Sequence, residues 1–230
     1  EIGPLANYYI LEACLKFKVK KYIFASSGSV YGLKKEKKVT EELGLDPITD
    51  YNKSKMICEK VILSYKDKIK TVILRPATVC GFSKRLRLDV VLNIFSYQAF
   101  FKKKITIFGG KQIRPLLHIK DMIYCYEYFI KKNITGIFNV GFENVKILDI
   151  AKEVQKIIPC DIISLKSNDP RSYRMNSDKL INTGFKPKHN FRDAISDLKD
   201  NFTNGFIPSE ENWNLNWLLK KKVIKKSAKQ

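Results

Sequence analysis

The sequence lacks the features of membrane, secreted and metal-binding proteins. No apolar run approaches the roughly 18 residues that a transmembrane helix requires, so we expect no membrane insertion. The N-terminus shows no basic segment followed by an apolar stretch and a cleavage site. The five cysteines are widely spaced, no C-x-x-C pair occurs and only two histidines are present, so we expect no metal site. These absences favour a cytoplasmic protein with reduced thiols.

Arginine is scarce as well. The chain has 36 lysines but only seven arginines, and its net charge is +20. Nucleic-acid-binding surfaces recruit arginine and cluster their charge, whereas these lysines are spread through the chain. We therefore expect no nucleic-acid partner, and the positive field would instead attract a small anionic substrate.

Glycine-rich turns are also missing. The eleven glycines are scattered, and no segment has the G-x-x-G-x-x-G pattern that lets a backbone approach a pyrophosphate at a helix N-terminus. Gly28 and Gly32 belong to a turn of a different kind.

Short apolar strands alternate with amphipathic helices along the chain. Residues 21–27 and Thr71–Leu74 predict strands, and the second is an unbroken apolar run of the kind found in parallel sheets covered on both faces. This alternation predicts an α/β fold with a doubly wound parallel sheet. Asp50 and Asp121 are expected to cap the helices that begin beside them, and His118 is expected to be structural.

The most informative stretch combines a strand end with a Tyr/Lys pair. The strand ends at Ser26 and Ser27, the turn Gly-Ser-Val-Tyr-Gly follows, and Tyr51 and Lys55 lie four residues apart on a predicted helix, so that they share one face. An ammonium beside a phenol favours the phenolate and lowers the tyrosine pKa, and a serine hydroxyl can hold a substrate oxygen. Because this spacing also occurs by chance on many helices, an exposed surface pair is the alternative.

Further segments accompany this stretch in a fixed order: LRPATVCG (74–81), RPLLHIKDM (114–122), FNVG (138–141) and DPRSY (169–173). With the S-S-G-S-V-Y-G turn and Y-N-K-S-K, they make the chain resemble the NAD-dependent epimerase/dehydratase family over roughly residues 5–204. These are extended short-chain dehydrogenases/reductases that act on nucleotide sugars. The resemblance implies a Rossmann-like sheet with a smaller α/β substrate lobe. The family's glycine-rich turn precedes the segments found here, so we expect the sheet to be N-terminally incomplete.

The resemblance also implies a division of the chain. Residues 1–81 and 112–135 would form the C-terminal part of the NAD-binding domain. Residues 82–111 and 136–206 would form the nucleotide-sugar-binding lobe, and residues 207–230 a basic tail.

The family assigns roles to the matching residues. Tyr51 would be the base that takes the proton of a sugar hydroxyl while the carbon gives a hydride to NAD⁺. Lys55 would lower the pKa of Tyr51 and bond the nicotinamide ribose, and Ser27 would position the hydroxyl. The nicotinamide end would lie near Ala77 and the sugar near Thr78, where many relatives carry asparagine. NAD is the implied cofactor, with NADP as the alternative, and a nucleotide-diphosphate sugar is the implied partner.

Arginines are the expected ligands of the diphosphate, because a guanidinium makes paired hydrogen bonds to phosphate oxygens. Arg114 and Arg171 match family positions with this role, and Arg87 is a weaker candidate. The alternative for Arg114 and Arg171 is a surface arginine or one that pairs with a carboxylate. A homodimer is compatible with the resemblance.

Three hypotheses for function remain open at this point. The favoured one is an epimerase or oxidoreductase that oxidises the sugar at C4. The second is a non-catalytic protein that retains the substrate lobe, and the least favoured is a nucleic-acid-binding protein. Dehydratases of the family carry Asp and Glu where this chain has Gly28 and Ser29, so 4,6-dehydration is not expected, and Asp89 is the nearest replacement carboxylate.

Overall fold

Residues 2–167 and 172–221 are described by the structure, a computed structural model. The helices are α1 (Ile2–Lys16), α2 (Asp50–Leu63), α3 (Val91–Lys102), α4 (Ile119–Lys131), α5 (Ile147–Ile157), α6 (Asp178–Asn182), α7 (Phe191–Thr203) and α8 (Asn214–Lys220). The strands are β1 (Lys21–Ala25), β2 (Lys70–Pro76), β3 (Thr78–Cys80), β4 (Lys104–Phe108), β5 (Ile113–His118), β6 (Gly136–Val140), β7 (Glu143–Lys146) and β8 (Asp161–Leu165). Two short 3₁₀ helices complete the set: η1 (Gly28–Tyr31) and η2 (Glu210–Asn212).

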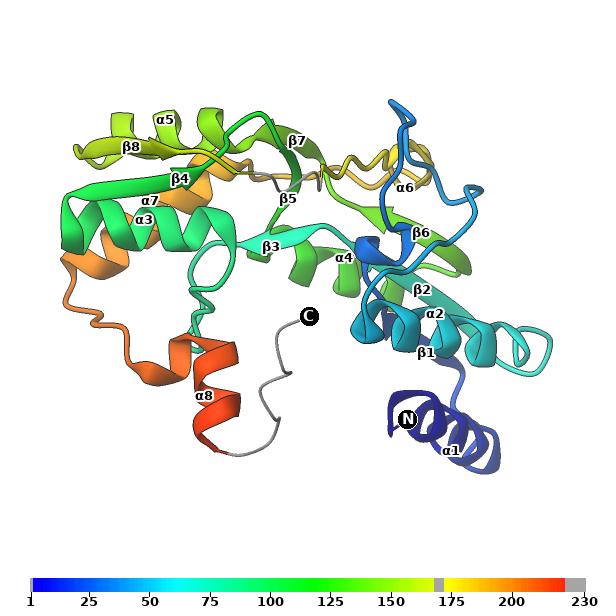
Figure 1. Cartoon of the computed structure of the whole chain (residues 1–230). Helices are drawn as coiled ribbons and strands as arrows, with labels where there is room; N and C mark the ends of the chain where they lie inside the picture. The colour runs from blue at the N-terminus through cyan, green and yellow to red at the C-terminus, as the bar shows by residue number, and fades with distance from the viewer. Residues whose placement is uncertain (1, 168–171, 222–230) are drawn as a thin grey trace.

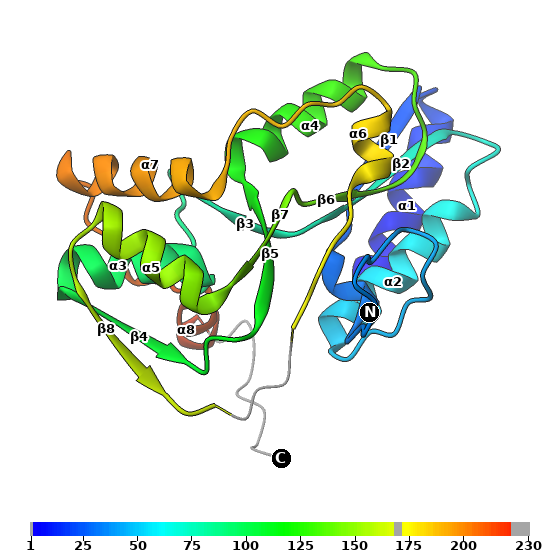
Figure 2. The same ribbon diagram turned by 90° about the horizontal axis from the view of Figure 1, so that it is seen from above.

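The first sheet is parallel and covered on both faces. Its strand order is β1-β2-β6, with Ala25 opposite Leu74 and Leu74 opposite Phe138. Along β2, Leu74 packs into the core with α4 and α6, whereas Ile73 packs with α1 and α2. Figure 2 shows these helices on opposite sides of the strands. The predicted α/β fold with a parallel sheet between helix layers is therefore confirmed.

The sheet β1-β2-β6 and its helices α1, α2, α4 and α6 form one body of structure, and a second body packs beside it. The parallel pair β4-β8 and the helices α3, α5 and α7 share one apolar core. A mixed sheet of order β3-β5-β7 lies between the two bodies (Figure 1). The core shared by α3, α5 and α7 contains residues from both before and after β5 in the sequence, as the predicted lobe does. The domain boundaries themselves stay a prediction.

Some local details differ from expectation. The strands β3 and β7 were not anticipated, since each is short and contains polar residues. Thr49, not Asp50, caps α2, because its hydroxyl accepts from the backbone N–H of Asn52. Likewise His118, not Asp121, caps α4, and Asp121 accepts instead from the backbone N–H groups of 188 and 189.

Within residues 2–167 and 172–221, none of the helices combines the length and apolar character needed to cross a membrane.

Candidate functional site

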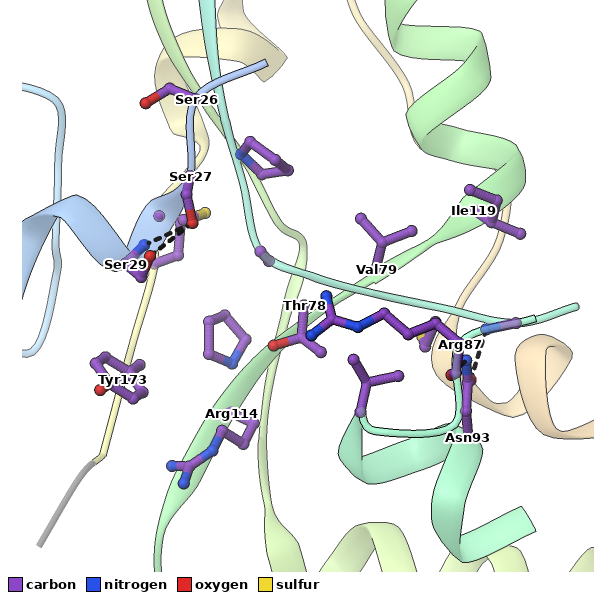
Figure 3. A pocket seen from close by; sticks show the side chains of 18 of the residues that line it. Ser26, Ser27, Ser29, Thr78, Val79, Arg87, Asn93, Arg114, Ile119 and Tyr173 are labelled. Atoms are coloured by element: carbon purple, nitrogen blue, oxygen red, sulfur yellow. Dashed lines mark hydrogen bonds between the residues drawn. The ribbon is translucent and has the colours of Figure 1, made fainter. Parts of the chain in front are cut away.

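A cavity of about 660 Å³ opens beside the carboxyl ends of β1 and β2. Figure 3 shows side chains from several elements facing it. The carboxyl ends of the parallel strands β1 and β2 lie at this edge, since Ala25 ends β1 opposite Leu74 and β2 continues from there to Pro76. Its lining includes six of the residues expected from the sequence, namely Ser27, Tyr51, Ala77, Thr78, Arg87 and Arg114. A cavity of this size at the strand ends matches the usual place and volume of ligand sites in α/β proteins.

The turn after β1 fixes the position of Ser27. Ser27 caps η1, and its Oγ accepts from the backbone N–H of Ser29 at 3.2 Å. The two hydroxyls also lie within hydrogen-bond distance, at 2.7 Å, and Ser29 Oγ donates to Oδ1 of Asn52 at 2.6 Å. Residues 26–32, which we call the serine turn, contain both of these serines. Since Asn52 is the neighbour of Tyr51 on α2, this chain of bonds joins the serine turn to the start of that helix.

Tyr51 and Lys55 lie together on α2. The Lys55 ammonium is 5.7 Å from the centroid of the Tyr51 ring and 4.8 Å from that of Phe24. Lys55 Nζ donates to the carbonyl oxygen of Ala25 at 2.7 Å. Burial lowers the pKa of Lys55. Tyr51 is 58% exposed and lines the cavity, while Lys55 is not among the lining residues.

Ala77 and Thr78 connect the first sheet to the middle one. The backbone N–H of Ala77 donates to the carbonyl of Val140, and Thr78 begins β3 opposite Leu116. Ala77 packs closely against Gly141, directly after β6, since a Cβ built on Gly141 would lie 2.5 Å from the Ala77 methyl. Both residues therefore line the cavity from a rigid stretch of backbone.

The predicted arginines differ in their surroundings. The guanidinium of Arg114 lies over the ring of Tyr173 at 5.4 Å, and its Nη1 donates to the carbonyl of Ile113. Arg87 forms an exposed ion pair with Asp89, with Nε and Oδ1 2.7 Å apart. Both line the cavity. Arg171 lies outside the described residues.

Sequence reasoning missed several lining residues. Tyr173, Arg174 and Met175 line the cavity from the segment that precedes α6. Tyr173 is held there by its backbone N–H, which donates to the carbonyl of Ile113 at 3.0 Å. Asn93 was missed too, and it bonds the backbone of Gly81 and Arg87. The one available signal was the match at 169–173, which ends directly before Arg174.

The cysteine and the histidine discussed next are poor candidates for a nucleophile or a general base at this cavity. Cys80 lines it, but burial, and then the charge of Glu143, raises the pKa of its thiol to about 12, so the thiol is neutral at pH 7. His118 is buried, caps α4 through Nδ1 and stacks on His189 with ring centroids 4.7 Å apart. In the described part of the chain, no group of three or more His, Cys, Asp or Glu side chains could hold a metal ion.

The chain resembles known proteins along most of its length. Residues 5–141 match the family described as NAD dependent epimerase/dehydratase. A UDP-glucose 4-epimerase from Lactobacillus helveticus is 32% identical over 216 residues, which cover 81% of this chain and 65% of that protein. A dTDP-D-glucose 4,6-dehydratase from Bos taurus is 27% identical over 88% of this chain. The chain thus spans about 65% and 62% of the length of these two relatives.

Solved structures agree with this match. A variant of UDP-glucuronic acid 4-epimerase from Bacillus cereus, in complex with UDP-4-deoxy-4-fluoro-glucuronic acid and NAD, superposes with a TM-score of 0.78 at 30% identity, covering 89% of this chain and 68% of that one. A Thermus thermophilus UDP-glucose 4-epimerase in complex with NAD has the same TM-score at 22% identity, over 89% of this chain and 71% of that one, and so supports the fold alone. The chain belongs to the NAD dependent epimerase/dehydratase family, as the sequence motifs predicted.

Proposed function

We propose that the protein carrying this chain is an NAD-dependent nucleotide-sugar epimerase or oxidoreductase that oxidises its substrate at the sugar C4 position. The main support is that Ser27, Tyr51 and Thr78 line one cavity at the ends of parallel strands. The relatives named above include 4-epimerases of UDP-glucose and UDP-glucuronic acid.

The residues present fit the nicotinamide end of NAD. Small residues border the cavity there, since β1 runs into Ser26 and Ser27, and Ala77 presents only a methyl group. Lys55 has three N–H donors, of which the carbonyl of Ala25 takes one, and the remaining donors suit ribose hydroxyls. Tyr51 and Ala77 line the cavity and would hold this end, and Lys55, which lies behind the lining, would reach the ribose with its remaining donors. The chemistry that NAD⁺ would supply there, when bound, is acceptance of a hydride from the sugar carbon and, in an epimerase, its return.

The proton transfers fall to the chain's own side chains. Tyr51 would act as the general base that takes the proton of the C4 hydroxyl and, in an epimerase, returns it at the end of the reaction. The ammonium of Lys55 lies 5.7 Å from the centroid of the Tyr51 ring, and the hydroxyl of Ser27 would hold the substrate oxygen in place. Arg114 and Arg87 would bind the diphosphate, with Arg171 in the same role.

Epimerisation or oxidation is favoured over dehydration. Elimination of water needs a base and an acid beside the sugar, but Gly28 has no side chain and Ser29 donates its hydroxyl to Asn52. The replacement carboxylate Asp89 is not among the residues that line the cavity, whereas its partner Arg87 is.

The test is product analysis by mass spectrometry and NMR, using the protein with NAD⁺ and a panel of nucleotide-diphosphate hexoses. We expect a product of unchanged mass with an inverted C4, or one that differs by two hydrogens. Loss of one water would refute the choice against dehydration. Binding of a nucleotide sugar without conversion would identify the non-catalytic alternative. The homodimer and the cytoplasmic location stay predictions.

A further inference from the structure

A buried ion pair lies next to the cavity without lining it. Glu59 of α2 and Arg75 of β2 meet in a two-pronged contact, with Oε1–Nε at 3.0 Å and Oε2–Nη2 at 2.7 Å. Their side chains are only 2% and 3% exposed. The free energy needed to remove two charges from water is about as large as the free energy gained from their attraction. Apolar residues of similar size could therefore stabilise the fold equally well. What the pair offers beyond apolar packing is a set of directional hydrogen bonds.

These bonds reach both sides of the serine turn. Ser26, directly before Ser27, borders the cavity, and its hydroxyl donates to Glu59 Oε1. In Figure 3 this hydroxyl points away from Thr78 and Arg87. Arg75 Nη1 donates to the hydroxyl of Tyr31 at 2.7 Å, and Tyr31 ends the 3₁₀ helix that Ser27 caps. The ion pair therefore holds the residue before Ser27 and the residue that closes its turn.

The same pair also holds the helix that carries the tyrosine. Tyr51, Lys55 and Glu59 follow one another at four-residue intervals, so they lie along one stripe of α2. Because a helix is stiff over two turns, fixing Glu59 sets both the rotation and the axial position of Tyr51. Lys55 adds its bond to Ala25, so the strand end and the helix are joined at successive turns.

We propose that the Glu59–Arg75 pair is a positioning device, which sets the Ser27 hydroxyl and the Tyr51 phenol at their working separation. This rests on the proposed function, in which those two groups act on one sugar hydroxyl. Neither charged residue touches the cavity, so their effect is exerted through Ser26, Tyr31 and α2. A misplacement of about 1 Å can cost about 10²-fold in rate, so the pair matters for turnover more than for substrate binding.

The first test removes both charges together, because a single substitution would leave the other charge buried and unpaired. In Glu59→Leu/Arg75→Met, we expect cooperative unfolding to persist, kcat to fall about 10- to 100-fold, and KM for the nucleotide sugar to stay within about threefold. A double variant that folds and keeps kcat within about twofold of the parent would overturn the proposal.

A milder pair of variants covers the case in which the double variant does not fold. Ser26→Ala removes only the hydroxyl that joins the turn to Glu59. Its control is Ser96→Ala, since Ser96 is equally buried but donates to the carbonyl of Leu92 within α3. We expect Ser26→Ala, and not the control, to lower kcat several-fold at unchanged KM.

Amide hydrogen exchange gives a readout that does not depend on activity. We expect Ser26→Ala to speed exchange in both 27–31 and 50–55, and Ser96→Ala to leave both segments unchanged. Unchanged exchange in both segments of Ser26→Ala would overturn the coupling. If the parent converts no nucleotide sugar but the exchange responds as expected, the proposed function fails and the coupling stands.

Discussion

At the scale of single residues, the proposed chemistry depends most on Tyr51. Its ring lines the cavity, and the ammonium of Lys55 lies 5.7 Å from the ring centroid. We expect Tyr51→Phe to lower kcat by about 10²–10⁴-fold, because the ring stays and only the proton-transferring hydroxyl is lost. Nucleotide-sugar affinity, measured by calorimetry, should change little.

The control is Tyr9→Phe, which alters a similarly exposed tyrosine on α1. Turnover of Tyr51→Phe within a few-fold of the parent would show that another group is the base.

Arg114 provides a second prediction at this scale. Its guanidinium lines the cavity and lies over Tyr173. Charge-assisted hydrogen bonds to a diphosphate contribute about 1.5–3 kcal/mol, so Arg114→Ala should weaken nucleotide-diphosphate binding about ten- to hundred-fold. Titration with UDP, GDP, CDP and dTDP measures this. Arg192→Ala is the matched control, since Arg192 pairs with Glu153 on the surface of α7. Equal affinities in the parent and Arg114→Ala would remove Arg114 from the site.

At the scale of elements, the serine turn depends on Gly32. This residue has φ of 67°, and a Cβ added to it would lie 1.9 Å from the carbonyl oxygen of Asp46. Gly32→Ala therefore combines a left-handed backbone with a clash against main chain, and should lower the free energy of unfolding by more than about 2 kcal/mol. Gly44→Ala is the control, because nothing lies within 4 Å of its added Cβ. Urea denaturation of both variants tests this, and equal midpoints would contradict it.

The elements best predicted from the sequence are those with a clear local pattern. The unbroken apolar run Thr71–Leu74 lies within β2, and the Tyr51/Lys55 spacing lies on α2 as expected. By contrast, β7 has one apolar residue, Val145, among charged and polar ones, and it pairs with β5 in an antiparallel register, which depends on contacts distant in the sequence. Its strand character comes from its partner and not from its own composition.

The residues that line the cavity also divide into those with a local sequence pattern and those placed by distant contacts. Ser27, Tyr51 and Thr78 occur in motifs that can be read from adjacent residues. Arg174 and Met175 reach the cavity only because distant bonds fix their segment, such as that from the backbone N–H of Met175 to Asn144 Oδ1 at 2.9 Å. Such a contact joins residues 31 positions apart and leaves no local pattern.

At the scale of the whole molecule, the two bodies of structure meet around a pair of histidines. His118 ends β5, where α4 begins, while His189 precedes α7 of the other body. Their rings stack, and His118 Nε2 lies 3.4 Å from Asp197 of α7 without forming a hydrogen bond. Protonation of His118 therefore acts where the two bodies contact each other.

The last prediction concerns the pH dependence that follows from this contact. Burial, and then the neighbouring His189, lowers the pKa of His118 below its ordinary value of 6.5, against the opposing effect of Asp197. Lys120 also lowers it, and Asp121 raises it. The unfolded chain therefore binds the proton more readily, so the contribution of His118 to stability is full above pH 6.5 and is lost as the pH falls towards the folded pKa.

The variant that tests this is His118→Asn, because an asparagine side chain can still accept from the backbone N–H of Lys120 and cap α4. Between about pH 7.5 and about pH 5.5, the parent should lose more free energy of unfolding than the variant, as measured by urea denaturation. Carboxylates that titrate in both proteins cancel in this difference. Equal losses in the two proteins would mean that His118 keeps an unshifted pKa in the fold, and that the contact between the two bodies does not respond to its protonation.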